Sequence, residues 1–251
     1  MKIGIIAAVQ EEIQTIHDDL HFHEMVEHAE RQFYFSNYKN IELVLVYSRV
    51  GKVAASITAS ALIEKFNVEK IIFTGLAGAV SKVLNRGDIV LCNQAYQHDL
   101  DARPLCEQQF EVPLTGRRLF QLNANEVTLA KTAIDNFFVN INNYVDLNEI
   151  RRLNIESPKL HIGIIATGDR FIEDIDSQKN LTVKGMEAMA VEMEGAAVAQ
   201  VCAEYQIPYI LIRTISDKAN ESAHVSLQDF SVKVASHYAS GIVQEILNLL
   251  T

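Results

Sequence analysis

The stretch AMAVEMEGAAVAQVC, residues 188–202, joins two kinds of secondary structure and gives the clearest indication of the fold. Its first part, MAVEM at 189–193, is short and apolar, which predicts a buried β-strand. Its second part is rich in alanine and valine and predicts a helix over 195–205, whose small side chains let it pack closely on a sheet. Glu192 and Glu194 lie where the strand ends and the helix begins. Because a buried carboxylate is costly unless it is paired or hydrogen-bonded, both side chains need partners in the folded chain.

Strand and helix patterns alternate on both sides of this stretch. Nearly continuous apolar runs, typical of strands covered by helices on both faces, predict strands at 2–9, 41–48, 70–76, 88–96, 161–168 and 209–216. Helices are expected at 53–65, around 126–138 and at 231–250. The alternation predicts an α/β fold with a mixed, largely parallel sheet. The polar, asparagine-rich segment 140–157 is interpreted as an excursion from one domain that spans 1–251.

Composition excludes several classes of partner. With 251 residues, 49% of them hydrophobic, the chain can form one sizeable core. Its formal net charge of −10 argues against a nucleic-acid partner, because no basic excess is present to displace counterions. No apolar run approaches the roughly 18 residues of a membrane-spanning helix, so no membrane partner is expected.

The N-terminus and the cysteines indicate the compartment. The first apolar run ends in QEE at 10–12 without a convincing cleavage site, which favours a buried strand over a signal peptide. Cys92, Cys106 and Cys202 form no CxxC pair, so neither a zinc cage nor a disulfide framework is predicted. Free thiols fit a reducing compartment, and a cytoplasmic protein is expected.

Polar and glycine-containing segments follow the predicted strands at their carboxyl ends. Ligands of open α/β sheets bind beyond those ends, so the segments are expected to converge on one crevice. They are Glu11-Glu12, Gly51, 74–78, 167–171, 192–194 and 213–217.

Familiar cofactor motifs are absent from these segments. GLAG at 75–78 is not the GxGxxG of dinucleotide sites, and VGKV at 50–53 lacks the spacing and the hydroxyl residue of a P-loop. His17, His21, His23 and His28 lie in a strongly polar stretch without further ligands at metal-binding spacing, which favours solvated histidines over a metal site.

Eight segments occur in the order and spacing of one family. They are GIIAAVQEE, VGKVAAS, TGLAGA, GDIV, HDLD, TGDRFI, AVEMEGAAVAQVC and RTISDKA. The chain resembles the nucleoside phosphorylase/nucleosidase family along almost its whole length, and within it the nucleosidases that hydrolyse 5'-methylthioadenosine and S-adenosylhomocysteine. The resemblance implies a three-layer αβα sandwich around a twisted sheet, a homodimer, and no metal or organic cofactor.

The resemblance also implies roles for two catalytic carboxylates. Asp217 would deliver a proton toward purine N7, and burial would raise its pKa as an acid at neutral pH requires. Glu12 would hold and activate the attacking water. Each has a structural alternative, because Asp217 could cap a helix and Glu12 could be a first-turn glutamate that interacts with the helix dipole.

Substrate contacts are implied residue by residue as well. Glu194 would accept the ribose 2'- and 3'-hydroxyls, with Met193 against the ribose face and Phe171 stacked on the base. Met193 and Phe171 could instead be core residues. The remaining binding residues implied are Val50, Ala77, Gly78, Ile172, Arg213 and Ser216. The pocket for the 5'-substituent would be formed by Val9 and Leu227, together with Ala102, Leu105 and Pro113 of the partner subunit.

Three leucines depart from the family pattern. Leu76 occupies a position where a small hydroxyl residue is common, and leucine can neither donate nor accept a hydrogen bond, which argues against phosphorolysis. Leu105 and Leu227 replace common aromatics, which leaves the 5'-substituent open. Arg170 is compatible with a substrate carboxylate or with solvent. The alternatives are a nucleosidase for another 5'-modified nucleoside such as futalosine, a purine nucleoside phosphorylase, and a non-catalytic nucleoside-binding protein.

Overall fold

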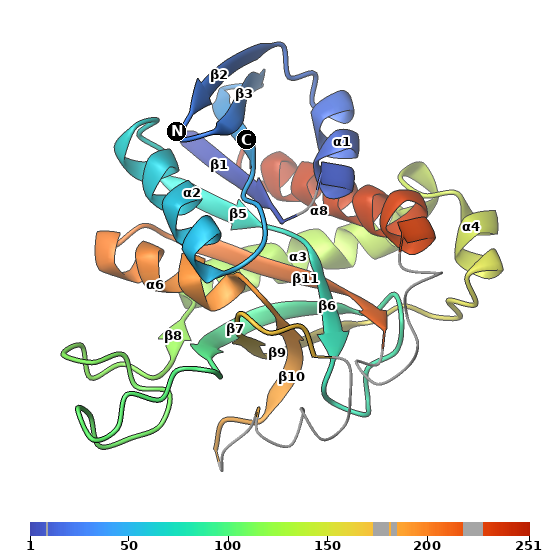
Figure 1. The fold of residues 1–251 in the computed structure, drawn as a ribbon. Coiled ribbons are helices and arrows are strands. Elements are labelled where there is room, and N and C mark those ends of the chain that lie inside the picture. The colour runs from blue at the N-terminus through green and yellow to red at the C-terminus, as the bar shows by residue number, and fades with distance from the viewer. Residues whose placement is uncertain (9, 173–180, 182–184, 218–227) are drawn as a thin grey trace.

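The computed structural model describes residues 1–8, 10–172, 181, 185–217 and 228–251, with only the backbone described at Asp217. The elements pack around one large sheet, with the N-terminus near one edge strand (Figure 1). None of the helices within these ranges is long and apolar enough to cross a membrane.

The sheet has eleven strands and mixes parallel and antiparallel pairs. Its central strands are parallel, β1 to β4 and β5, and β11 to β5 and β6, whereas the edges are antiparallel. In spatial order the strands are β2 (Glu24–His28), β3 (Arg31–Tyr38), β4 (Ile41–Tyr47), β1 (Lys2–Ala7), β5 (Lys70–Phe73), β11 (Tyr209–Asp217), β6 (Leu76–Ala79), β10 (Ala188–Glu192), β9 (Leu160–Thr167), β7 (Ile89–Gln97) and β8 (Phe120–Gln121). The mixed central sheet confirms the predicted class.

Part of the sheet also closes on itself. The long strand β11 pairs with β5 through its first residues and then with both β6 and β7. Since β6, β10, β9 and β7 are paired in series, this additional pairing joins five strands into a ring. The sequence pattern gave no indication of this closure, because it depends on which distant strands meet.

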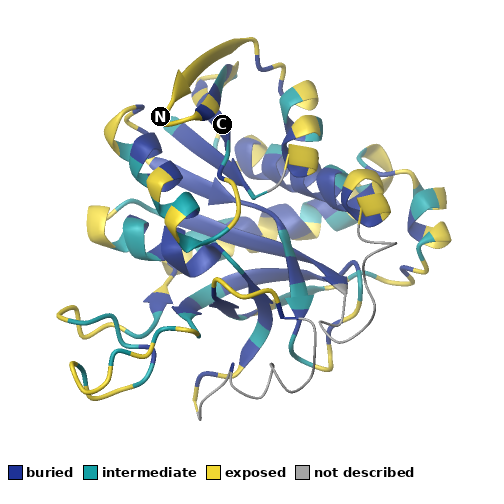
Figure 2. Ribbon diagram, in the orientation of Figure 1, coloured by how far each residue is buried: buried dark blue, intermediate teal, exposed yellow. Residues whose placement is uncertain are grey.

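Helices cover both faces of the sheet. Apolar side chains of α1 (Gln10–Asp19), α3 (Ala124–Val139) and α8 (Ser236–Leu249) form one core, and those of α2 (Lys52–Glu64) and α6 (Gly195–Tyr205) belong to another. Strand β1 shows the expected alternation, with Ile3 and Ile5 in the first core and Ile6 in the second. The burial colouring shows these dark-blue strands between the helix layers (Figure 2), as the predicted three-layer sandwich requires.

Several elements differ from the prediction. Helix α1 was considered only as a structural alternative for Glu12, and the β2–β3 hairpin was not expected, because β2 is exposed at every residue and lacks an apolar pattern. The strand expected at 70–76 is divided into β5 and β6, which pair with different neighbours. The helix expected at 231–250 begins with a π-helical turn, Ser231–Ala235.

The segment 140–157 is partly helical. It contains a 3-10 turn (Ile141–Asn143) and α4 (Leu147–Arg152), whose Ile150 is buried in the first core. The excursion is therefore anchored to the sandwich by an apolar contact.

Candidate active site

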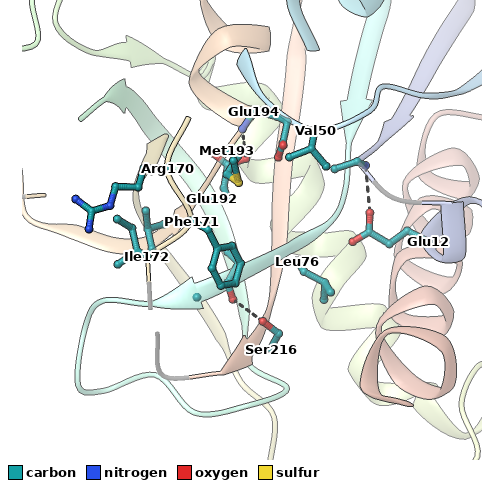
Figure 3. Close-up of a pocket in the computed structure, with 14 residues that line it drawn as sticks. Glu12, Val50, Leu76, Arg170, Phe171, Ile172, Glu192, Met193, Glu194 and Ser216 are labelled. Carbon is teal, nitrogen blue, oxygen red and sulfur yellow. Dashed lines mark hydrogen bonds between the residues drawn. The ribbon is translucent and has the colours of Figure 1, made fainter. Parts of the chain in front are cut away.

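A cavity of about 230 Å³ opens at the carboxyl ends of β1, β9 and β10, as the predicted convergence requires (Figure 3). It brings together segments from distant parts of the chain. Of the residues singled out from the sequence, Glu12, Val50, Ala77, Gly78, Phe171, Ile172, Met193, Glu194 and Ser216 line it. Ala8, Leu76, Arg170, Val191 and Glu192 complete the lining.

Glu12 lies in the first turn of α1 with only 1% of its surface exposed. Its Oε2 accepts the backbone N–H of Ala8 at 3.2 Å, which fixes the carboxylate at the cavity wall. Glu11, by contrast, is exposed. The helix turn thus directs one of the two adjacent glutamates inward and the other to solvent.

Gly75 allows Glu12 and Arg213 to approach the same point of the backbone. A Cβ atom at this position would lie 3.4 Å from Glu12 Oε1 and 3.3 Å from Arg213 Nη1. Both groups therefore lie close to Gly75, and a side chain at this position would crowd them.

Arg213 does not line the cavity but lies beneath it, 1% exposed. Its Nη2 and Nε donate to Glu192 Oε2 at 2.6 and 3.2 Å, and its guanidinium carbon lies 4.1 Å from the centre of the Phe73 ring. The arginine predicted to contact substrate therefore reaches the cavity through Glu192.

The Glu192 carboxylate accepts hydrogen bonds from two side chains and two backbone amides. Besides Arg213, the backbone N–H groups of Glu194 and Gly195 donate to its Oε2 at 3.1 and 2.7 Å, and the Thr167 hydroxyl donates to its Oε1. Four of these five hydrogen bonds converge on Oε2 and one reaches Oε1. The Glu192 carboxylate is therefore held in one position by its donors, as the need for partners predicted.

Glu194 is buried, with 4% of its surface exposed, but its carboxylate has a different environment. Its Oε1 accepts the backbone N–H of Gly51 at 2.8 Å. Burial raises the pKa of the Glu194 carboxyl to about 7, and the negative charge of Glu192 acts in the same direction. Close to neutrality, this group can be either an acceptor or a donor.

The opposite wall of the cavity is apolar. Phe171 points into the cavity opposite Leu76, and 52% of its surface is exposed (Figure 3). Ile172 is buried beside it. Ser216 Oγ donates to the Ala77 carbonyl at 3.4 Å. An exposed aromatic ring above a small apolar floor can stack on a planar base.

Hydrogen bonds tie the loop that carries Phe171 to the start of α2. Asp169 Oδ1 accepts the backbone N–H of Lys52 at 2.8 Å, and the N–H of Asp169 donates to Asp99 Oδ2 at 2.8 Å. The ammonium of Lys52 closes the cluster, 2.6 Å from Asp99 Oδ1. Consecutive amides at the start of α2, those of Gly51 and Lys52, therefore hold both walls of the cavity.

The other predicted residues are located elsewhere or lie outside the description. Asp217 ends β11 next to Gly78 in the strand register, and its side chain is outside the described residues, as are Val9 and Leu227. Ala102, Leu105 and Pro113 belong to the long loop between β7 and β8 and do not line the cavity of their own chain. Leu105 is 84% exposed.

Thr167, Gly51 and Gly75 were not singled out as individual site residues. Their signal in the sequence is weak, since a threonine at the end of a strand and a glycine after one are common. The histidines of the N-terminal region do not gather around a metal, and across the described ranges no three His, Cys, Asp or Glu side chains are placed to hold one. His17 instead packs edge-on against Tyr34.

Comparisons with known proteins agree with this geometry. A family model described as the phosphorylase superfamily matches residues 2–248. The aminodeoxyfutalosine nucleosidase of Campylobacter jejuni is 37% identical over 244 residues, which cover 97% of both chains. The 5'-methylthioadenosine/S-adenosylhomocysteine nucleosidase of Staphylococcus haemolyticus is 34% identical, over 99% of this chain and 100% of its own.

Solved structures give the same result. The S-adenosylhomocysteine nucleosidase of Streptococcus pyogenes superimposes with a TM-score of 0.85 at 29% identity, covering 100% of this chain and 98% of its own. The futalosine hydrolase of Helicobacter pylori has a TM-score of 0.83 at 29% identity, with coverage of 99% and 98%. Because the family model matches nearly every residue, the chain belongs to the phosphorylase superfamily.

Proposed function

We propose that this protein is a purine nucleosidase that hydrolyses the N-glycosidic bond of 5'-methylthioadenosine and S-adenosylhomocysteine, and also of 5'-deoxyadenosine. The products are adenine and the 5'-substituted ribose. The observation that carries the proposal is the cavity in which Glu12, Glu194 and Phe171 meet. These residues supply a base for water, an acceptor for ribose hydroxyls and a ring for the purine.

The site must activate a water molecule, protonate the leaving base and bind the ribose as its ring flattens. Water attacks the anomeric carbon as the bond to purine N9 breaks, and the electron pair of that bond remains on the purine. Glu12 takes the proton of the water, and Asp217, by family resemblance, protonates N7 so that the base leaves as a neutral molecule. The ribose ring flattens as positive charge develops, as in glycoside hydrolysis generally.

The charge around the cavity favours water over phosphate as the nucleophile. Glu12, Glu192 and Glu194 all contribute carboxylates to the lining, and Arg213 already donates to Glu192. Leu76 adds an aliphatic wall where a phosphate would need a donor. A phosphate dianion would therefore meet repulsion and an unfavourable apolar contact.

A nucleosidase for a futalosine-type nucleoside is the second candidate. The relative at 37% identity is named an aminodeoxyfutalosine nucleosidase, and one structural neighbour is named a futalosine hydrolase. The aliphatic Val50 and Leu76 do not select one 5'-substituent over another. A panel of 5'-modified nucleosides compared by kcat/KM separates the two candidates.

The proposal includes one domain over 1–251, a cytoplasmic location, a role in methionine salvage and a homodimer. The dimer is supported by apolar side chains that the single chain leaves exposed, among them Leu105 at 84% and Val53 at 72%. In the dimer, Ala102, Leu105 and Pro113 of one subunit would complete the 5' pocket of the other.

The decisive experiment measures adenine release from 5'-methylthioadenosine in phosphate-free buffer. We expect turnover without phosphate and no stimulation when phosphate is added. Phosphate-dependent turnover that yields ribose 1-phosphates would refute the hydrolase assignment. Absence of turnover with intact nucleoside binding would favour a binding protein.

A further inference from the structure

Two glutamates, Glu192 and Glu194, lie at the start of helix α6 and have different hydrogen-bond partners. Glu194 is the N-cap residue of α6, yet its side chain makes no capping hydrogen bond. N-cap side chains ordinarily accept an N–H of the first turn, because these groups have no partner within the helix. At this helix other residues satisfy them.

Each amide at the start of α6 has a partner other than the Glu194 side chain. The Gly195 N–H donates to Glu192 Oε2 at 2.7 Å, and the Ala196 N–H donates to Thr167 Oγ1 at 2.8 Å. The N–H groups of Ala197 and Val198 donate to the Glu194 carbonyl at 3.0 and 3.2 Å. The helix is capped, and the Glu194 carboxylate remains available to bind Gly51 and face the cavity.

The position of Glu192 is itself determined by its neighbours. Arg213 holds one carboxylate oxygen from below, and Thr167 holds the other from β9. Gly195 leaves the space that the carboxylate needs, because a Cβ there would lie 3.1 Å from both oxygens. The Glu192 carboxylate also accepts the backbone N–H of Glu194 at 3.1 Å, so it fixes the backbone from which the Glu194 side chain extends.

We propose that Glu192 is a positioning residue, which caps α6 in place of Glu194 and so directs the Glu194 carboxylate toward Gly51 and the ribose. The ribose part of this statement rests on the proposed function. The Gly51 contact does not, and it can be measured without substrate.

The substrate-free test is hydrogen exchange at the Gly51 amide, followed by NMR in Glu192→Gln. The glutamine keeps the size of the side chain but has one acceptor oxygen and an NH₂ group facing Arg213 and two backbone donors. We expect faster exchange at Gly51 and Gly195. Unchanged protection of Gly51 would overturn the proposal, whatever the protein catalyses.

The ligand test compares adenine with a 7-deaza analogue of 5'-methylthioadenosine, which lacks the N7 that is protonated for cleavage. In Glu192→Gln we expect the Kd of the analogue to rise about 10- to 100-fold, the size expected when a hydrogen bond to a charged acceptor is lost, and the Kd of adenine to stay within about twofold. Equal weakening of both ligands would indicate a general loss of structure and overturn the proposal. Failure of the unmodified protein to bind the analogue would refute the proposed function instead, leaving the exchange result to decide the role of Glu192.

A double variant tests whether Glu192 acts through Glu194. If Glu192 acts through Glu194, Glu192→Gln in a Glu194→Gln background should add less than about twofold to the Kd, because contacting residues are not additive. If the double variant instead shows the product of the two single-variant increases in Kd, the proposal is contradicted. Thr167→Val removes one donor to Glu192 and the acceptor of the Ala196 N–H, and we expect a smaller rise of the Kd in the same direction.

Glu126→Gln is the matched control. Glu126 is a half-buried carboxylate in the first turn of α3 that, like Glu192, is paired with a cation, Lys70 at 2.6 Å, but it does not line the cavity. We expect this variant to lose stability while keeping both Kd values and the exchange rate at Gly51.

Discussion

The Glu194 carboxylate and the Gly51 backbone amide lie 2.8 Å apart, although 143 positions separate them in the sequence. This contact joins the start of α6 to the start of α2 and places the proposed ribose acceptor at the mouth of the cavity. Gly51 has φ of +97°, a conformation that favours glycine. The contact therefore depends on the local backbone at one end and on the capping by Glu192 at the other.

Nucleoside binding should weaken below neutral pH. The pKa of Glu194 is raised to about 7, first by burial, so the carboxyl gains a proton as the pH falls below that value and then accepts the ribose hydroxyls less well. We expect the Kd of the 7-deaza analogue to rise about tenfold for each pH unit below 7. The Kd of adenine, which has no ribose, should not rise in this way over the same pH range. A pH-independent Kd for the analogue would contradict the assignment of Glu194 as the ribose acceptor.

Replacing Glu194 should stabilise the fold at alkaline pH. The pKa of Glu194 in the folded protein, about 7, lies above the ordinary value of 4.5, so its stabilising effect is complete below pH 4.5 and is lost as the pH rises through 7. We expect Glu194→Gln to show a Tm above that of the unmodified protein at pH 8, with the gap narrowing toward pH 5. Thermal unfolding at several pH values measures this difference in Tm. Glu11→Gln, at an exposed position, is the control for the loss of one charge. A constant gap would show that Glu194 does not titrate in this range.

The two carboxylates proposed as catalytic should be distinguished from their neighbours by the effect of substitution on kcat. We expect Glu12→Gln and Asp217→Asn each to lower kcat by about 10²–10⁴-fold, the usual contribution of general acid–base catalysis. Circular dichroism should show an intact fold. Glu11→Gln changes the adjacent, exposed carboxylate and should leave kcat unchanged. Near-normal turnover in either catalytic variant would remove its assignment.

Phe171 should act on the base without supporting the fold. Its ring is 52% exposed, so Phe171→Ala removes little buried area and should leave the Tm nearly unchanged. Stacking of a base on an aromatic ring contributes about 1–3 kcal/mol, which corresponds to a rise in KM of about 5- to 150-fold. Phe171→Tyr keeps the ring and should keep KM. An unchanged KM in the alanine variant would place the purine elsewhere.

The exposed loop between β7 and β8 should control assembly. Leu105→Glu puts a charge on a side chain that is 84% exposed in the single chain and expected at the subunit contact. We expect a shift from dimer to monomer in sedimentation velocity, together with a higher KM. Val139→Glu, at a position 83% exposed at the end of α3, is the matched control and should remain dimeric. A dimer with normal KM in Leu105→Glu would refute the shared 5' pocket.

Most of the central elements follow from local sequence. Apolar runs predict β1, β4, β9 and β11 closely, since burial between two helix layers requires such runs. Helix α1 was anticipated only as an alternative setting for Glu12, because it is short and polar on its outer face, and the β2–β3 hairpin was missed, because β2 is exposed throughout. The division of 70–79 into β5 and β6 depends on pairing with β1 and β10, which local pattern does not encode.

The candidate site, too, could be predicted only in part from the sequence. The motifs identified residues that line the cavity, and the sequence alone established the α/β class and the gathering of polar strand ends, because both depend on properties of a few neighbouring residues. Only the tertiary structure decided which of these two cavity carboxylates, Glu192 and Glu194, accepts from Arg213 and Gly195 and which accepts from Gly51, and that Arg213 reaches the cavity through Glu192. Those differences depend on donors contributed by β9, β11 and the start of α2, which meet only when the chain has folded.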